Sequence, residues 1–562
     1  MTDKVNTSPR DGEISRRTML ATSAAALVAA TGGPILLQMG RAYAQSSSAV
    51  GAPAETLVVG FGSGPNGTDM DFYQAPRSIE IYRNVCISPL AYPPKPVGSA
   101  YEPDFTKLEG HAAKEWTVSP DGKSITITLK SGVMSSVGNE LTVDDPIWTI
   151  RRNFALNGIN AGFLKTVAGL STPDNVVKKD RYTYTITLDR PNALIESNMA
   201  HVEFQILDSA EYKKHVTGDD PWAVKWAQTN IVGHGPYKLT AYQAGESFTL
   251  ERNENYSAKL MAITGNIGKI VAQAIPNSSS RLQLLQAGSI DMGFDFSASE
   301  LSQLEGSGVR VDRLSGNYLQ WLGFTFAHEL KDLNVRFAIM HALPLDQLVS
   351  GPYLGIAKQM DSMNAPSYPG YSITRTAWQK PKYDLNLAKS FLAKSAYPNG
   401  FDTTLDFDAG VVGQEETATI IKSALQGIGI NVQLNKRQTT DYFQYAYAIG
   451  GGFPGLFLYR DFAGNPDPLF SIGLWVITGH CCSPGKYGNA DIDRLYREAQ
   501  TTIGDPQKRF DLARQIEDIM WNKDPFGVPL DFNGFQAASS PKVTGWMWGP
   551  VQEVYWHSVV KK

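Results

Sequence analysis

Residues 401–434 read FDTTLDFDAGVVGQEETATIIKSALQGIGINVQL, and this stretch indicates how the chain folds. Residues 404–407 predict a strand, and residues 430–434 predict a second one. Between them runs a helical pattern whose apolar face holds Ile420, Ile421, Leu425 and Ile428. Gly427 and Gly429 end the helix. A strand, helix and strand in this order predict a parallel sheet covered by helices.

The segments on either side of this unit extend the same pattern. Asp384 predicts the start of a helix over residues 385–396, which Tyr-Pro-Asn-Gly then ends. Residues 57–61 and 182–188 predict strands, and a Ser-Pro-Asp-Gly turn at 119–122 predicts a hairpin. We therefore expect an α/β protein with more than one lobe.

The composition is that of an ordinary globular protein, with 42% hydrophobic and 19% charged residues and a net charge of −4. Because the chain has no basic block, we expect neither nucleic-acid binding nor attachment to an anionic membrane surface. Three cysteines in 562 residues cannot form a disulfide framework. Large packed cores must therefore supply the stability.

Residues 1–44 predict a twin-arginine export signal. Arg16 and Arg17 precede an Ala-rich apolar run over residues 19–37, and an Ala-Tyr-Ala cleavage site follows. A Thr-Gly-Gly-Pro sequence interrupts the run, which makes it a poor membrane span. No cysteine follows the cleavage site, so we expect no lipid anchor. The prediction is a mature periplasmic protein that begins near Gln45.

Patterns associated with cofactor, metal or hydrolytic chemistry have simpler explanations here. Residues 62–67 match G-x-G-x-x-G, but Pro65 and Asn66-Gly67 favour a turn, so we expect a loop beside the ligand. The adjacent Cys481 and Cys482 seldom chelate one ion and have no second cluster nearby. The common hydrolase signatures are missing. We predict no cofactor, no metal and no catalytic activity.

In their order along the chain, several segments resemble the family 5 extracellular solute-binding proteins, which are receptors of peptide and nickel ABC importers. The blocks lie at residues 115–145, 233–256 (opening with GHGPY), 281–291, 334–346, 384–401 and 491–530. Together they extend over roughly residues 55–545. The resemblance implies an α/β, two-lobed, class II periplasmic-binding-protein fold with mixed sheets flanked by helices and a ligand cleft between the lobes.

The resemblance also implies a domain organisation. Lobe one would hold residues 45–315, be completed by 528–562, and contain an inserted subdomain at about 95–225. Lobe two would hold residues 316–527. The chain has small residues near both expected crossings, which suits hinge motion.

Asp461 most resembles the aspartate with which peptide-binding relatives hold the α-ammonium group of their ligand. The alternative is that Asp461 caps a turn at the lobe surface. Nearby aromatic side chains can add stacking, and ligands of open α/β sheets sit beyond the carboxyl ends of strands. Residues 83–88 resemble a cleft-lining segment of the relatives. The candidate ligand-binding residues are Asp461, Tyr459, Phe462, Trp475, Trp321, Phe407, Asp408, Cys86 and Ser88.

The predicted function is that of a monomeric periplasmic receptor, which captures a small solute by closing its lobes and delivers it to an inner-membrane ABC permease. A di- or oligopeptide is the first expectation for the ligand. An opine, an oligosaccharide or another conjugate is the alternative, and a free metal ion is the least expected. Two other classes stay open at this point: a periplasmic hydrolase, and a receptor that serves a sensor or export clients.

Overall fold

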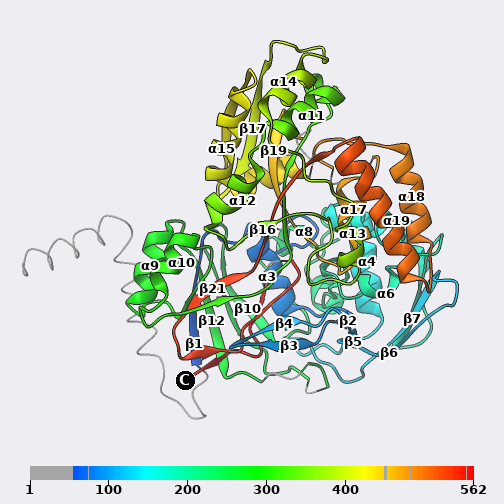
Figure 1. The fold of residues 1–562 in the computed structure, drawn as a ribbon. Coiled ribbons are helices and arrows are strands. Elements are labelled where there is room, and N and C mark those ends of the chain that lie inside the picture. The colour runs from blue at the N-terminus through cyan, green and yellow to red at the C-terminus, as the bar shows by residue number, and fades with distance from the viewer. Residues whose placement is uncertain are drawn as a thin grey trace, which may run out of the picture. The chain divides into compact units, whose positions relative to one another are not determined.

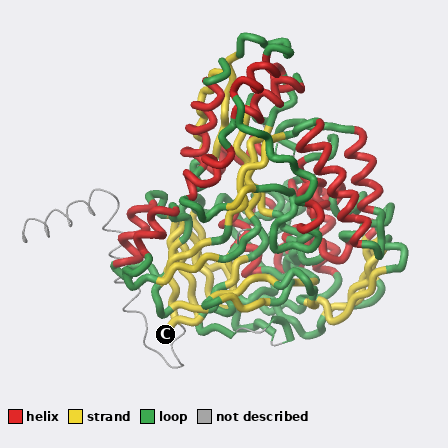
Figure 2. Tube along the Cα trace, viewed as in Figure 1, coloured by secondary structure: helices red, strands yellow, loops and turns green. Residues whose placement is uncertain are grey.

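The computed structural model describes residues 55–562 apart from positions 74, 258, 262–263, 448–451, 480–482 and 552. Figures 1 and 2 show the helices and strands of this part. The predicted export signal, Cys481 and Cys482 lie outside the described residues. Within the described part, no helix is both long enough and apolar enough to cross a membrane.

A seven-stranded mixed sheet forms the first core. In spatial order its strands are β10 (Tyr237–Gln243), β11 (Ser247–Arg252), β12 (Ile267–Ala274), β1 (Glu55–Phe61), β13 (Met292–Gly293), β21 (Gln536–Ser539) and β14 (Arg310–Arg313). The central β1 runs parallel to β12 and β13, which confirms the strand predicted at residues 57–61. Helices α9 (Ser278–Gln286) and α10 (Ala298–Leu304) contribute to a small apolar cluster against this sheet.

A six-stranded mixed sheet forms the second core. Its order is β16 (Lys358–Gln359), β20 (Gly527–Asn533), β15 (Tyr318–Gly323), β19 (Leu456–Phe462), β17 (Phe401–Asp408) and β18 (Ile430–Arg437). The predicted strand-helix-strand unit is confirmed: β17 and β18 are parallel over their whole length, and α15 (Gln414–Gln426) connects them. Ala418, Ile421 and Leu425 of α15 are buried in the core beneath it.

Further helices surround the second sheet. They are α11 (Leu333–Ala342), α12 (Leu345–Tyr353), α13 (Tyr371–Thr374), α14 (Leu385–Leu392), α16 (Thr439–Ala446), α17 (Pro468–Trp475), α18 (Ala490–Gln500) and α19 (Pro506–Asp518), with the short turns η3 (His328–Lys331) and η4 (Ile519–Lys523). Figure 1 shows α11, α14 and α15 beside β17 and β19. Asp384 caps α14 as predicted, but the helix ends at Leu392, before the expected residue 396. The Ser395 hydroxyl donates to the Leu392 carbonyl there and favours a turn.

The remaining strands form smaller sheets. An antiparallel sheet contains, in order, β6 (Ala113–Val118), β7 (Ser124–Leu129), β9 (Thr183–Thr187) and β8 (Val176–Lys178). Another four-stranded sheet contains, in order, β24 (Val554–Tyr555), β23 (Met547–Trp548), β4 (Ala100–Pro103) and β3 (Pro94–Val97). Two further sheets have two strands each: β2 (Leu90–Ala91) pairs with β5 (Glu109–Gly110), and β22 (Val543–Thr544) pairs with β25 (Val560–Lys561). The β6–β7 hairpin and β9 confirm two predicted elements, and Gly122 supplies the positive φ of 66° that the hairpin turn needs.

Helices also accompany these smaller sheets. They are α3 (Pro76–Val85), α4 (Asp144–Leu156), α5 (Ile159–Thr166), α6 (Ile195–Asn198), α7 (Ser209–Lys213) and α8 (Val224–Ala227), with η1 (Pro173–Asn175) and η2 (Val202–Phe204).

A two-stranded antiparallel ribbon carries the chain between the two large sheets. β14 continues into β15, and β20 continues into β21 alongside them. The Leu314 N–H donates to the Phe535 carbonyl at 2.9 Å in the crossing itself. A Cβ on Gly316 would lie 2.6 Å from the Phe535 nitrogen, so only glycine fits there. The second crossing was expected near residues 526–529, but that segment pairs with β15 inside the six-stranded sheet, and the ribbon crosses at 534–535 instead.

A buried charge cluster ties α4 to the loop after β1. The Arg152 guanidinium contacts the Asp69 carboxylate at 2.6 Å and the Asp71 carboxylate at 2.6 Å, and all three side chains are almost fully buried. Arg152 also donates to the Trp222 carbonyl at 2.9 Å. Because each partner satisfies the others, loss of the arginine would leave two carboxylates buried without a cation.

We expect Arg152→Gln to lower the free energy of unfolding by about 3–5 kcal/mol, since it leaves those two carboxylates unpaired. Urea denaturation of the ligand-free protein measures this loss. Lys178→Gln is the matched control because its pair with Asp144 is largely exposed, and we expect it to cost less than about 1 kcal/mol. Equal losses in the two variants would contradict the assigned role of Arg152.

Candidate ligand-binding site

Asp461 lies within β19, a central strand of the six-stranded sheet, where it faces Leu319 of β15. Its side chain is buried, with 3% of the residue exposed. The Ser471 hydroxyl donates to the carboxylate at 2.9 Å. Burial raises the pKa of Asp461 to about 6, although Ser471 and the nearby Trp475 indole oppose the shift. The alternative that Asp461 caps a surface turn is therefore wrong.

The Asp461 carboxylate has no cationic partner within the described part of the chain. None of the ion pairs formed by those residues includes Asp461. By contrast, the equally buried Asp467, six residues later, pairs with Arg509 at 2.9 Å. An ionised carboxylate that is buried without a counter-ion is costly. The site therefore favours a ligand that brings a positive charge.

One cavity contains Asp461 together with three other predicted residues. From the chain between the end of α16 and the end of α17, the cavity is lined by Tyr447, Tyr459, Asp461, Phe462, Phe470, Leu474 and Trp475. From the chain that runs from α3 to η2, it is lined by Ile79, Ile159, Phe163, His201, Val202 and Glu203, and Val551 completes the lining. The Tyr459 and Trp475 ring centroids are 4.5 Å apart, and a second group of rings contains Phe163, His201 and Phe470. The cavity thus combines one buried carboxylate with aromatic walls, an arrangement suited to an organic cation.

His201 and Glu203 line the same cavity as Asp461. The His201 ring stacks on Phe163 at 4.8 Å and lies 4.8 Å from the Phe470 ring centroid. Its Nδ1 contacts the Glu203 carboxylate, while its buried Nε2 has no hydrogen-bond partner among the described residues. The pair therefore adds a second carboxylate and a free imidazole nitrogen to the same cavity.

A second cavity lies where the carboxyl ends of parallel strands from both large sheets meet. Asp408 is the last residue of β17, Thr439 follows β18, and Phe462 is the last residue of β19. Ser63 and Asp295 lie just beyond β1 and β13. The Thr439 hydroxyl donates to Asp408 at 2.7 Å. Burial nevertheless raises the pKa of Asp408 to about 6. Phe462 lines both cavities, so the two are neighbours.

Arg460 gives the second cavity a positive charge. Its guanidinium lies 5.3 Å from the centre of the Tyr318 ring and reaches the Val412 carbonyl at 3.5 Å. No described carboxylate forms an ion pair with Arg460, and its buried Nε lacks a partner in this part of the chain. Consecutive strand residues point to opposite faces. Arg460 and Asp461 therefore present opposite charges to neighbouring cavities.

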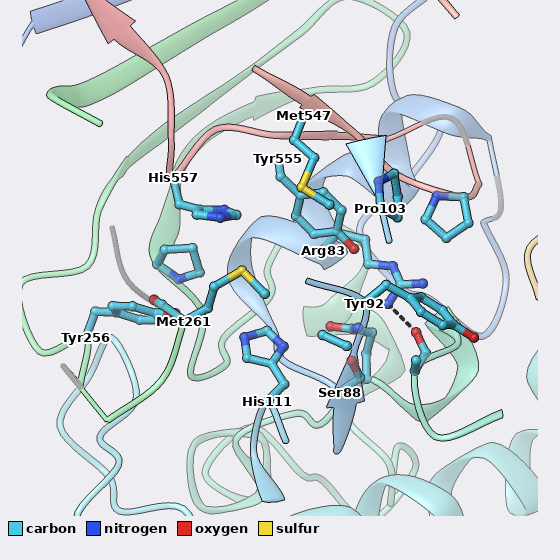
Figure 3. A pocket seen from close by; sticks show the side chains of 15 residues that line it. Arg83, Ser88, Tyr92, Pro103, His111, Tyr256, Met261, Met547, Tyr555 and His557 are labelled. Atoms are coloured by element: carbon cyan, nitrogen blue, oxygen red, sulfur yellow. Dashed lines mark hydrogen bonds between the residues drawn. The ribbon is translucent and has the colours of Figure 1, made fainter. Parts of the chain in front are cut away.

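The other predicted residues lie outside the cavity that contains Asp461. Phe407 is packed in the core of the six-stranded sheet, and Trp321 supports Tyr459 from behind at 5.0 Å between ring centroids. Cys86 is fully buried, and burial raises the pKa of its thiol far above the usual value. Ser88 lines a separate cavity (Figure 3).

Sequence reasoning missed His201, Glu203 and Arg460. His201 and Glu203 occupy an irregular segment between two very short helices, so no periodic pattern marks them. Strand alternation next to Asp461 was the one available signal for Arg460. In the loop at 62–67, the Gly62 N–H donates to Asp295 at 2.8 Å and the Asn66 N–H to Ser78 at 3.1 Å. These donors are internal, and no group of three or more His, Cys, Asp or Glu in the described ranges is placed to hold a metal ion.

These cavities are candidate ligand sites in a two-lobed α/β protein, and solved structures share its fold. The periplasmic binding protein DppA from Helicobacter pylori, in complex with the peptide STSA, matches with a TM-score of 0.78 and 23% identity over 90% of this chain and 98% of that one. AgaA from A. tumefaciens, in complex with agropinic acid, matches with a TM-score of 0.76 and 19% identity over 89% and 98%. The predicted fold class is confirmed.

The model of the bacterial extracellular solute-binding proteins, family 5, matches residues 107–480. The chain belongs to this family, as its sequence blocks predicted, and is a solute-binding receptor rather than an enzyme. It is 24% identical over 464 residues to heme-binding protein A from Haemophilus influenzae. The aligned region covers 79% of this chain and 82% of that protein.

The raised pKa of Asp461 predicts a pH dependence. Its value moves from 3.8 to about 6 on folding, so between these values the folded chain binds more protons than the unfolded chain. The stabilisation by this group is complete below pH 3.8 and is lost as pH rises through about 6. The variant Asp461→Asn avoids that loss, so its stability relative to the parent should increase by on the order of 2 kcal/mol from pH 4 to pH 7.

Urea denaturation of both ligand-free proteins at the two pH values measures this difference. All other titrating groups are common to the two proteins, so their contributions to the pH dependence of the unfolding free energy largely cancel in the difference. A difference that does not change with pH would contradict burial of an uncompensated carboxylate at position 461.

Proposed function

We propose that this receptor captures a di- or oligopeptide, or another small ligand with a free ammonium group, and delivers it intact to an inner-membrane ABC permease. The observation that carries the proposal is the buried Asp461 carboxylate, which has no cation among the described residues. A ligand ammonium would supply the missing charge through a charge-assisted contact. The aromatic walls would cover the adjoining side chain of the ligand.

The second cavity supports a ligand with a negative group as well. Arg460 lines it without an ion pair to any described residue. The first turns of α3 and α15 also reach this cavity through Arg77 and Gln414, and helix N-termini favour anions. An ammonium at Asp461 and a carboxylate near Arg460 are the two ends of a short peptide. AgaA, which shares this fold, was solved in complex with agropinic acid, so a ligand other than a peptide is the alternative.

The crossing ribbon would act as the hinge of this receptor. In this proposal lobe one contains the seven-stranded sheet with its inserted subdomain at about 95–225, and lobe two contains the six-stranded sheet. The boundaries follow the ribbon at residues 314–317 and 534–535. Gly316 and Gly534 allow the backbone changes that closure requires. Ligand shifts the equilibrium to the closed form only by binding it more tightly than the open form.

The cellular setting is part of the same proposal. The twin-arginine signal at residues 1–44 would export the folded chain to the periplasm, where it would act as a monomer without a lipid anchor. Fusion of residues 1–44 to a reporter that folds in the cytoplasm tests this step, and replacement of both Arg16 and Arg17 by Lys should abolish its export.

Asp461→Asn should weaken binding of a free tripeptide pool by at least tenfold, because a charged hydrogen bond contributes about 1.5–3 kcal/mol. Isothermal titration calorimetry measures the affinity. N-terminal acetylation of the same peptides should cause a similar loss in the parent protein. Asp441→Asn, at an exposed position of α16, is the matched control and should bind normally. Unchanged affinity in Asp461→Asn would contradict the assignment.

Closure predicts a smaller radius of gyration in solution X-ray scattering when a binding peptide is saturating. The parent protein should contract, and Asp461→Asn at the same peptide concentration should not. A tight complex with an unchanged scattering profile would exclude hinge closure, while recovery of a cleaved peptide would exclude a purely receptor function.

A further inference from the structure

A third cavity lies apart from the two cavities described above. It is lined by Arg83, Ser88, Ala91, Tyr92, Pro103, His111, Ala200, Gln205, Pro236, Tyr256, Met261, Met547, Pro550, Tyr555 and His557. No residue lines both this cavity and the one that contains Asp461. Its volume of about 30 Å³ is enough for an ion or a few waters.

Two imidazoles and two thioethers face this space. Figure 3 shows Met261 extending between His111 and His557, with Met547 entering from the β23 side. The ring nitrogens of both histidines form no hydrogen bond with any described residue. Two imidazoles and two thioether sulfurs thus line one small cavity.

The donor set selects a soft ion. None of the fifteen lining residues is Asp, Glu or Cys, so the cavity lacks the carboxylates common in Mg²⁺ and Ca²⁺ sites and the thiolates common in zinc sites. Methionine thioethers and imidazoles select Cu(I). A single positive charge also costs less than two beside Arg83, which is paired with Glu553 at 3.1 Å.

We propose that this cavity binds one Cu(I) ion through His111, His557, Met261 and Met547. The four donors come from chain segments that are distant in sequence, so the ion would fasten the C-terminal segment 547–557 to the segments around residues 111 and 261. Bound copper would stabilise the folded protein by mass action. This site does not depend on the solute in the cleft.

The test uses the chain from Gln45 onward with Cys481 and Cys482 replaced by Ser, because cysteine thiolates would also bind Cu(I). Anaerobic titration with Cu(I) against bicinchoninate should give one equivalent of tightly bound metal. X-ray absorption of that complex should show a mixed shell of nitrogen and sulfur, and the melting temperature should rise with Cu(I). Absence of a bound equivalent, or a shell without sulfur, would overturn the proposal.

The double variant Met261→Leu with Met547→Leu removes both sulfurs while nearly conserving volume. It should lose at least 100-fold in Cu(I) affinity, yet keep the melting temperature of the copper-free parent and its peptide binding. Met340→Leu with Met520→Leu is the matched control, because both side chains are buried elsewhere. Equal Cu(I) affinity in the two double variants would overturn the assigned ligands, as would tighter binding of Zn²⁺ or Ni²⁺ than of Cu(I) by the parent.

Discussion

The antiparallel ribbon that crosses between the two large sheets is the constraint on which the rest of the structure depends. β21 fills a position between β13 and β14, and β20 fills one between β16 and β15. Neither sheet is complete until a segment more than 200 residues away in sequence has paired with it. The two sheets are therefore linked in folding. One apolar cluster includes residues of both sheets, such as Val59 and Tyr459, and a second lies against the six-stranded sheet. Where the ribbon crosses, two glycines let the strands approach closely.

Electrostatics distinguishes the parts of this protein that hold the fold together from those that bind. Arg152 and its two aspartates form a closed cluster whose charges satisfy one another. Asp461 and Arg460 are buried or half-buried charges without such partners among the described residues. Desolvation of an unpaired charge weakens the empty protein, and the contact that a ligand then makes recovers part of that cost. In a receptor, unpaired buried charges can therefore lie where a ligand of opposite charge would contact them.

The sequence predicted the periodic elements well and named four of the residues that line one candidate cavity. The strand-helix-strand unit at 401–434, the hairpin at 119–122 and the first strand follow from local patterns and turn residues. Phe462, Tyr459 and Trp475 were found because they are close in sequence to Asp461. His201 and Glu203 approach the same cavity from more than 250 residues away, and local patterns contain no information about such pairings. The crossing at 534–535 was misplaced for the same reason, since only the pairing with β15 shows where β20 ends.

The position of Arg460 and Asp461 limits the shape of a ligand that contacts both. They are consecutive residues of β19, so their side chains point to opposite faces of the sheet. The strand ends at Phe462, which lines both cavities. A ligand with charges at its two ends can reach Arg460 and Asp461 only by passing around this carboxyl end, beside Asp408 and Thr439. Such a path favours an extended molecule over a single amino acid, whose charges lie on one carbon. It also makes the Phe462 ring the surface over which the middle of the ligand would lie.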